Sequence, residues 1–290
     1  MNTTKLYSNL DKSVKPVVVG VLCNLTIAFL KFGIASMGGS RLVLMDGLFS
    51  FMGAVTFLIP WQAQVIEQKP YNEKYPYGLG KLLFISMVVV GFLGLVISIH
   101  MFYYSLVVMV GLQIHGLYTL AIMVTLISII TNEVLFRYLK EKSKSCPNTM
   151  LAMSGRYNRI GAWISSFVLL FLILSYLGGA YLERFGVAII SLVVFFVSLR
   201  MLFVGFAGIM DKVPSQQIMK HIKICAQKVS QVNEIVNIKA RHVGTLLHID
   251  MWITVDDDLS MFEADKIARH VKVQLMEKIP SAREVNIIIT

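Results

Sequence analysis

The amino-acid sequence predicts an α-helical membrane protein in which a six-helix transmembrane bundle is followed by a small α+β domain. Of its 290 residues, 56% are hydrophobic and the mean hydropathy is +0.68, whereas a soluble domain is about 45–50% apolar. The apolar excess is confined to residues 16–207, and residues 208–290 have the composition of a soluble domain. We therefore expect three parts: an N-terminal segment (1–15), a transmembrane domain (16–207) and a C-terminal domain (208–290).

Six segments meet the length that a spanning helix needs, about 20 predominantly apolar residues. They are Pro16–Met37, Leu42–Val65, Leu82–Leu112, Leu117–Leu139, Met150–Leu177 and Phe185–Phe206. Only Gly38–Arg41 separates the first from the second, which predicts a tight helical hairpin. The third segment is longer than a bilayer requires, so it is expected to tilt or to project from the membrane.

Lysine and arginine residues in the short loops predict the orientation. One side of the membrane has ten of them and the other has two, Arg41 and Arg184. Because positive residues remain on the cytoplasmic side, both termini are expected in the cytoplasm, with the chain in the cytoplasmic (inner) cell membrane. The ten are Lys5, Lys12, Lys15, Lys69, Lys74, Lys81, Arg137, Lys140, Lys142 and Lys144.

The C-terminal domain has alternating helical and strand patterns that predict a ferredoxin-like αββαβ fold. The expected elements are a helix at Ile218–Val229, strands at Ile235–His242 and Leu246–Val255, a helix at Met261–Lys278 and a strand at Val285–Ile289. Val243-Gly244 is the expected hairpin turn.

Several classes of protein are not supported. The three cysteines, Cys23, Cys146 and Cys225, have no CxxC spacing, so neither a disulfide framework nor a cysteine zinc site is expected. The sequence has no P-loop, GxSxG, HExxH or complete glycine fingerprint, so we expect neither an enzyme nor a bound cofactor. The net charge is +10, and the basic residues lie beside apolar spans. This position indicates a role in membrane orientation rather than in binding nucleic acid.

Six short motifs occur in an order that resembles the cation diffusion facilitator family. They are Lys31 before the Gly39-Ser40 hairpin, Leu44–Ser50, Tyr75–Lys81, Ile209-Met210-Asp211, Arg241-x-x-Gly244 and Glu263-Ala264-Asp265. The resemblance implies a proton-coupled exporter of divalent metal cations that works as a homodimer. A divalent cation would then be its substrate, and the lipid bilayer its surroundings.

The resemblance also locates the family's membrane metal site on this chain. In the family, two ligands lie four residues apart on the second span and two on the fifth, so that each pair shares one helical face. The corresponding residues here are Phe49, Gly53, Tyr157 and Gly161, and none of these is a good metal ligand. Shifting the fifth span by one residue, for example to Asn158, recovers no histidine or aspartate.

Asp46 is the one acidic residue in the middle of a predicted span. A charge there costs about 2.5–3.5 kcal/mol on insertion scales, so such residues are usually functional or paired. Two interpretations remain open. Asp46 either contacts a transported cation or proton, or it is a structural carboxylate bonded to Asn24, Lys31 or a serine.

Three further charges are candidates for the cavity. Arg156 and Arg159, in the first turns of the fifth span, either line the cavity, where a pair with Asp46 would repel a divalent cation, or extend to the cytoplasmic headgroups. Glu133, near the cytoplasmic end of the fourth span, is either an interfacial polar residue or a waypoint for a proton or cation.

The resemblance implies that Lys81 and Asp211 form a charge interlock joining two protomers. The alternative is two unrelated surface charges at these positions.

Weak candidates for metal ligands are Asp46 in the bundle and four residues of the C-terminal domain. His248 and Asp250 alternate on a predicted strand and therefore face one side, where His242 or Asp265 could complete a site. The alternative is that these are ordinary surface polar residues.

Two functions follow from these patterns. The first is a secondary transporter that exports a divalent cation in exchange for protons, with Asp46, Ser50, Tyr157 and Asn158 as oxygen ligands for an ion harder than zinc. The second is a transport-silent relative that serves as a scaffold or regulatory subunit, in a heteromer with a ligand-complete partner. Phe49 and Gly53 favour this second hypothesis.

Overall fold

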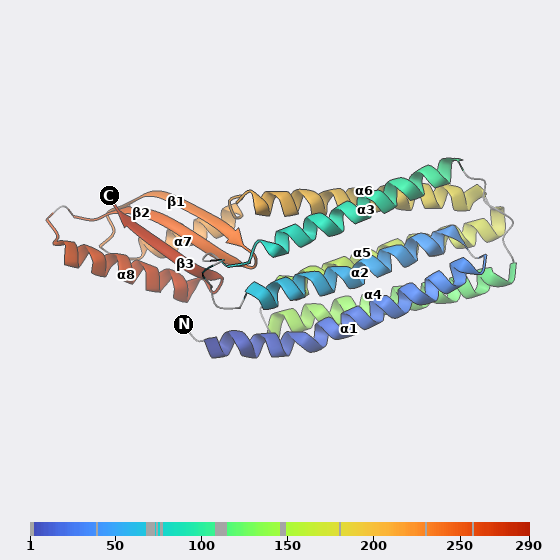
Figure 1. Ribbon diagram of the computed structural model, residues 1–290, viewed down its shortest axis with the longest axis horizontal. Coiled ribbons are helices and arrows are strands. Elements are labelled where there is room, and N and C mark those ends of the chain that lie inside the picture. The colour runs from blue at the N-terminus through green and yellow to red at the C-terminus, as the bar shows by residue number, and fades with distance from the viewer. Residues whose placement is uncertain are drawn as a thin grey trace. The chain divides into compact units, whose positions relative to one another are not determined.

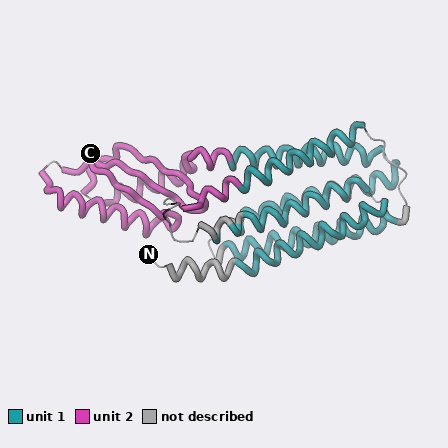
Figure 2. The backbone as a smooth tube through the Cα atoms, viewed as in Figure 1, with its two compact units in different colours: residues 1–65, 86–205 teal, residues 66–85, 206–290 magenta. Residues whose placement is uncertain are grey.

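The computed structural model (Figure 1) describes residues 3–38, 40–67, 73, 75, 78–107, 115–145, 149–179, 181–229, 231–256 and 258–290. The chain divides into two compact units, residues 1–65 with 86–205 and residues 66–85 with 206–290 (Figure 2). We refer to them as the helical unit and the C-terminal unit.

Six helices of the described residues are long and apolar enough to cross a membrane, which confirms the predicted fold class. They are α1 (Thr3–Ser36), α2 (Arg41–Glu67), α3 (Leu82–Val107), α4 (His115–Ser145), α5 (Thr149–Gly178) and α6 (Tyr181–Ile209). Five of them extend beyond the predicted spans, most of all α1, α4 and α6, because helical hydrogen bonds continue through polar residues. The helix α1 begins within the predicted N-terminal segment, α4 ends at Ser145 and α6 begins at Tyr181.

The predicted hairpin between α1 and α2 is present. Gly38 has a φ of +88°, a conformation that glycine adopts without steric cost; Gly39 lies outside the described residues. Glu183, at the start of α6, accepts hydrogen bonds from the hydroxyl of Ser40 (2.7 Å) and the backbone N–H of Arg41 (2.5 Å). A carboxylate at a helix N-terminus is stabilised by the unpaired N–H groups there, so this contact connects the hairpin to α6.

Apolar side chains cover both the inside and the outside of the helical unit. Leu42, Phe49, Val168 and Val194 belong to one buried cluster, which joins α2, α5 and α6. Exposed apolar side chains occur on all six helices, for example Phe29 on α1. Helices that are apolar all round are characteristic of a membrane environment.

Small residues allow α3 and α6 to pack closely. A Cβ atom added at Gly91 of α3 would lie 2.9 Å from the backbone nitrogen of Leu202 on α6 and 3.0 Å from the carbonyl oxygen of Ser198. Gly94, one turn further along α3, also faces Ser198. Such small residues are how membrane helices bring their backbones together.

The C-terminal unit contains the predicted αββαβ order. Its elements are α7 (Gln216–Gln227), β1 (Glu234–Val243), β2 (Leu246–Thr254), α8 (Met261–Lys278) and β3 (Ala282–Ile289). The sheet order is β1-β2-β3, with β1 antiparallel and β3 parallel to β2. A parallel neighbour requires a crossover, which α8 provides after a capping box formed by Ser260 and Glu263. Residues of α7, α8 and the strands form one buried apolar core.

We predict that Gly91→Ala destabilises the protein by about 1–3 kcal/mol, because the new methyl group meets backbone that cannot move independently. Thermal unfolding in detergent measures the effect. Gly33→Ala is the matched control, since a Cβ there meets no atom within 4 Å, and it should leave the melting temperature unchanged or raise it. Equal melting temperatures for Gly91→Ala and the unaltered protein would contradict close packing of α3 on α6.

Candidate functional site

The centre of the helical unit contains a buried ion pair between α1 and α2. The Nζ atom of Lys31 lies 2.7 Å from Oδ2 of Asp46, and the two side chains are 0% and 1% exposed. Of the three bonding partners that the structural interpretation named for Asp46, the carboxylate contacts Lys31 and a serine, and Asn24 bonds elsewhere.

Three serine hydroxyls complete a cage of oxygen atoms around the ammonium group of Lys31. Nζ donates to Ser128 of α4 (2.7 Å), Ser50 of α2 (3.1 Å) and Ser165 of α5 (3.5 Å). The hydroxyl of Ser165 in turn donates to Oδ1 of Asp46 at 2.9 Å. We call Asp46, Ser50, Ser128 and Ser165 the oxygen cage.

The cage explains why a charged pair is tolerated at this depth. Removing two charges from water costs several kcal/mol per ion, and their attraction compensates only when the remaining hydrogen-bonding groups are also satisfied. Every side-chain oxygen of the cage contacts Lys31 or another member of the cage. The arrangement is that of a cation site in which the ammonium group of Lys31, a side chain of α1, takes the place of a free ion.

The four residues at the family's ligand positions lie in the same unit but form no metal site. The rings of Phe49 and Tyr157 stack with centroids 4.7 Å apart and planes 3° apart, and the Tyr157 hydroxyl donates to the backbone oxygen of Phe49 at 3.3 Å. A Cβ at Gly53 would meet Oδ1 of Asn24 at 2.5 Å, and one at Gly161 would meet Asn132 at 3.4 Å. Aromatic rings and amides therefore occupy this region.

Two of the oxygen ligands expected from the sequence do not reach the cage. Asn158 accepts a hydrogen bond from Asn24 (3.1 Å) and donates to the backbone oxygen of Ser154 (2.8 Å), while Tyr157 bonds to Phe49. The structure corrects this expectation and substitutes Ser128 and Ser165. Neither serine belongs to a motif, so the sequence signal was only a polar residue within an apolar span.

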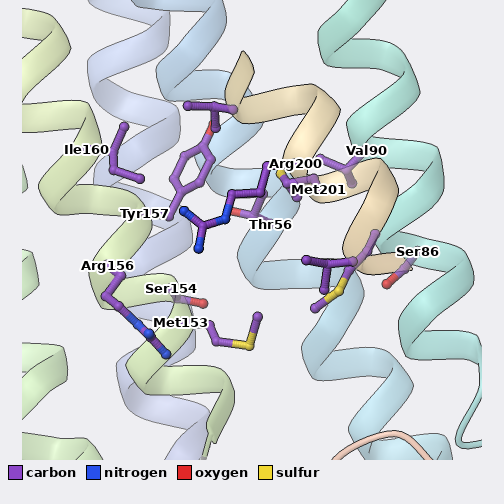
Figure 3. A pocket seen from close by; sticks show the side chains of 13 residues that line it. Thr56, Ser86, Val90, Met153, Ser154, Arg156, Tyr157, Ile160, Arg200 and Met201 are labelled. Atoms are coloured by element: carbon purple, nitrogen blue, oxygen red, sulfur yellow. The ribbon is translucent and has the colours of Figure 1, made fainter. Parts of the chain in front are cut away.

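The three charged residues predicted as candidates for the cavity lie in three different environments. Arg156 lines a pocket (Figure 3), whereas Arg159 lies over the ring of Phe136 at 4.7 Å. Glu133 pairs with Arg137 on the same helix at 2.8 Å. Among the described residues none of the three forms an ion pair with Asp46, so the structure does not support a pairing of Asp46 with the arginines. The waypoint at Glu133 stays a prediction.

The C-terminal unit brings Lys81 and Asp211 together within one chain. Nζ of Lys81 lies 3.1 Å from Oδ2 of Asp211, and Nη1 of Arg241 lies 3.1 Å from the same oxygen. Asp211 has a φ of +56° and follows the end of α6, where the N–H of Lys212 donates to the carbonyl of Ala207. This is the left-handed cap that commonly ends a helix. The interlock between protomers remains a prediction.

The candidate metal ligands of the C-terminal unit do not converge. His248 pairs with Glu284 (Nδ1 to Oε2, 3.1 Å), and Asp250 accepts a hydrogen bond from Asn286 at 2.9 Å. Asp265 pairs with Arg269 on α8. Within the ranges that the structure describes, no three His, Cys, Asp or Glu residues are grouped so that they could hold a metal ion, which corrects the expectation that His242 or Asp265 completes a site.

Six membrane-length helices with a charged centre, followed by an α+β domain, define a multi-pass membrane protein. Comparison with known families is more specific. Residues 17–210 match the cation efflux transmembrane domain, and residues 214–289 match the cytoplasmic domain of cation efflux proteins. The chain belongs to the cation efflux family, whose members are transporters rather than enzymes, and the cytoplasmic domain supports a homodimer.

Individual relatives are distant but cover nearly the whole chain. The magnetosome protein MamB of a Magnetospira species is 24% identical over 254 residues, covering 88% of this chain and 87% of its own. The manganese efflux system protein MneP of Bacillus subtilis is 25% identical over 280 residues, covering 93% of both chains. A nickel form of the MamM C-terminal domain is 24% identical, with a TM-score of 0.26, and covers 26% of this chain and 96% of its own.

We predict that Lys31→Met destabilises the protein by about 3–5 kcal/mol, because it leaves the Asp46 carboxylate buried without a counter-charge. The double variant Lys31→Met/Asp46→Leu should recover most of this loss, since it removes both charges. Thermal unfolding of Lys31→Met, Asp46→Leu and the double variant gives the coupling free energy between the two side chains. Additive effects would show that the two groups do not act as a pair.

In the C-terminal unit, burial lowers the pKa of His248 below its ordinary value of 6.5, although the neighbouring Glu284 opposes the shift. The unfolded chain therefore binds this proton more readily, and stability is lost as the pH falls below 6.5. We expect amide exchange in β2 of the full-length protein to be less protected at pH 5.5 than at pH 7.5. His248→Gln should reduce this difference, and an unchanged difference would contradict the assignment.

Proposed function

We propose that this protein exports a hard divalent cation such as Mn²⁺ from the cytoplasm in exchange for protons, and that the oxygen cage is its cation site. The supporting observation is the cage itself, in which Lys31 Nζ lies within 2.7–3.5 Å of four oxygen atoms on three other helices. The similarity to a manganese efflux protein supports the same class of substrate.

The chemistry of the cage favours a hard ion. It offers one carboxylate and three hydroxyls, with no imidazole or thiolate. Oxygen ligands suit manganese, magnesium and calcium, whereas zinc prefers sites that include nitrogen or sulfur. The absence of a nitrogen or sulfur ligand therefore argues against zinc as the main substrate.

Exchange with protons follows from the position of the Lys31 amine, which lies inside the cage and can carry a proton there. An ammonium group and a metal ion cannot share one cage, because two cations at such a distance repel strongly where water is excluded. A metal ion that binds Asp46 therefore requires the Lys31 side chain to lose its proton. When the ion leaves, a proton restores the ammonium group and the cage closes around it again.

A second candidate function is a transport-silent subunit that pairs with a ligand-complete relative. The stack of Phe49 on Tyr157 favours it, because these rings fill the region where the family's ligands would be. In that case the Lys31–Asp46 pair is purely structural, and it replaces the bound ion that would otherwise hold α2, α4 and α5 together.

Transport into liposomes with a metal-sensitive dye and an imposed pH gradient tests both candidates. We predict Mn²⁺ flux that falls at least about tenfold in Asp46→Asn and several-fold in Ser128→Ala, the loss expected for charged and neutral ligands. Ser166→Ala is the matched control, since this α5 hydroxyl donates to the Ala162 carbonyl of its own helix and, among the described residues, bonds to no other group. Its flux should be unchanged.

The two candidates give different outcomes. If purified dimers show no flux of Mn²⁺, Fe²⁺, Co²⁺, Zn²⁺ or Cd²⁺, the transporter proposal fails and the silent subunit is favoured. If flux occurs but Asp46→Asn retains it, the protein is a transporter and the cage is not its site.

A further inference from the structure

The helical unit also contains a pocket whose lining includes none of the four residues of the oxygen cage. This pocket, of about 320 Å³, is lined by residues of α2, α3, α5 and α6 (Figure 3). Two of the lining residues, Arg156 of α5 and Arg200 of α6, carry positive charge, and no lining residue carries negative charge. Figure 3 shows the Arg200 side chain extending from α6 into this space, with Tyr157 among its neighbours.

Both arginines lie well inside their helices. Arg156 follows the start of α5 at Thr149 by seven residues, and Arg200 precedes the end of α6 at Ile209 by nine. At 1.5 Å per residue these separations are about 10 Å and 14 Å. Because α5 and α6 are consecutive spans that run in opposite directions, both guanidinium groups belong to the same half of the membrane.

Within the part of the chain that the structure describes, neither arginine forms an ion pair. The described residues include six ion pairs, and neither Arg156 nor Arg200 takes part in any of them. A positive charge among spanning helices is expensive unless it is paired or reaches water. Both arginine side chains are exposed, so two guanidinium groups without an ion-pair partner are accessible to an anion in this pocket.

The other lining residues indicate what kind of anion fits. Met153, Met201, Val90 and Ile160 make most of the wall apolar. A ligand that is charged at one end and apolar at the other matches such a pocket better than a small hydrated ion does. The volume suffices for a headgroup phosphate but not for a whole lipid, so acyl chains would remain in the bilayer.

We propose that this pocket binds the phosphate group of an acidic phospholipid, with Arg156 and Arg200 as the two charge-assisted donors. Guanidinium groups recognise phosphate through paired N–H···O bonds, and basic pockets between membrane helices bind anionic lipid headgroups. A lipid bound here would touch α5 and α6 together, and would thereby link the helices of the oxygen cage to the packed pair of α3 and α6. The proposal does not depend on which ion the protein transports.

The first test measures the lipid that accompanies the purified full-length protein. Protein extracted in mild detergent should retain about one acidic phospholipid per chain by mass spectrometry of the extract, as expected for a site with two charged donors. The variant Arg156→Gln/Arg200→Gln should lose it. Arg159→Gln is the matched control, because this neighbouring arginine on α5 lies over Phe136 and not in the pocket, and it should retain the lipid.

The second test measures affinity directly and excludes a folding artefact. Delipidated protein is titrated with dioctanoyl phosphatidylglycerol, with octanoate and with inorganic phosphate, and each variant's melting temperature is recorded. We expect phosphatidylglycerol to bind the unaltered protein at least about tenfold more tightly than it binds Arg200→Lys or the double glutamine variant. Octanoate and phosphate should bind weakly.

Three results would overturn the proposal. Equal phosphatidylglycerol affinity in the folded double variant would show that the arginines do not form the site. If octanoate bound as tightly as phosphatidylglycerol, the group that the pocket recognises would be a carboxylate rather than a phosphate. Inorganic phosphate binding equally well would show that the apolar wall has no role. None of these measurements involves an ion gradient, so they stand apart from the transport assay.

Discussion

The charged pair of Lys31 and Asp46 is the interaction on which the helical unit depends. It lies at the centre of apolar helices, is almost fully shielded from solvent, and is stable only because hydroxyls from α2, α4 and α5 satisfy both partners. A buried pair of this kind contributes less to net stability than to specificity, since few other arrangements of the helices could satisfy both charges. The positions of four helices are therefore coupled through one ammonium group.

The remaining two helices are held by different forces. Backbone approach at Gly91 brings α3 against α6, and the contact of Glu183 with Ser40 and the Arg41 amide connects α6 to the hairpin. Polar bonding thus organises one group of helices, and close packing of small residues organises the other. The pocket with Arg156 and Arg200 has walls from both groups, so a ligand there would respond to any change between them.

Much of this architecture could be predicted from the sequence, and the reasons for the gaps are physical. The length of the apolar segments predicted six helices, and the alternation of apolar and polar residues predicted the strands of the C-terminal unit. Both patterns are local in the sequence, so neither requires knowledge of the packing. The family motifs located Phe49, Gly53, Tyr157 and Gly161 and showed that metal ligands were missing. The partners of Lys31 could not be predicted, because Ser128 and Ser165 meet it only after α4 and α5 pack. Which of Arg156 and Arg159 lines the pocket likewise depends on the rotation of α5 about its own axis, which the sequence does not give.

The central claim is that one cage holds either the ammonium group of Lys31 or a transported cation. Proton release on metal binding tests it most directly. Mn²⁺ added to the purified protein in weakly buffered detergent should release about one proton per ion bound, because the metal displaces the proton that Lys31 carried. Binding of Mn²⁺ without proton release would contradict the account, since the ion and the ammonium group would then occupy separate places.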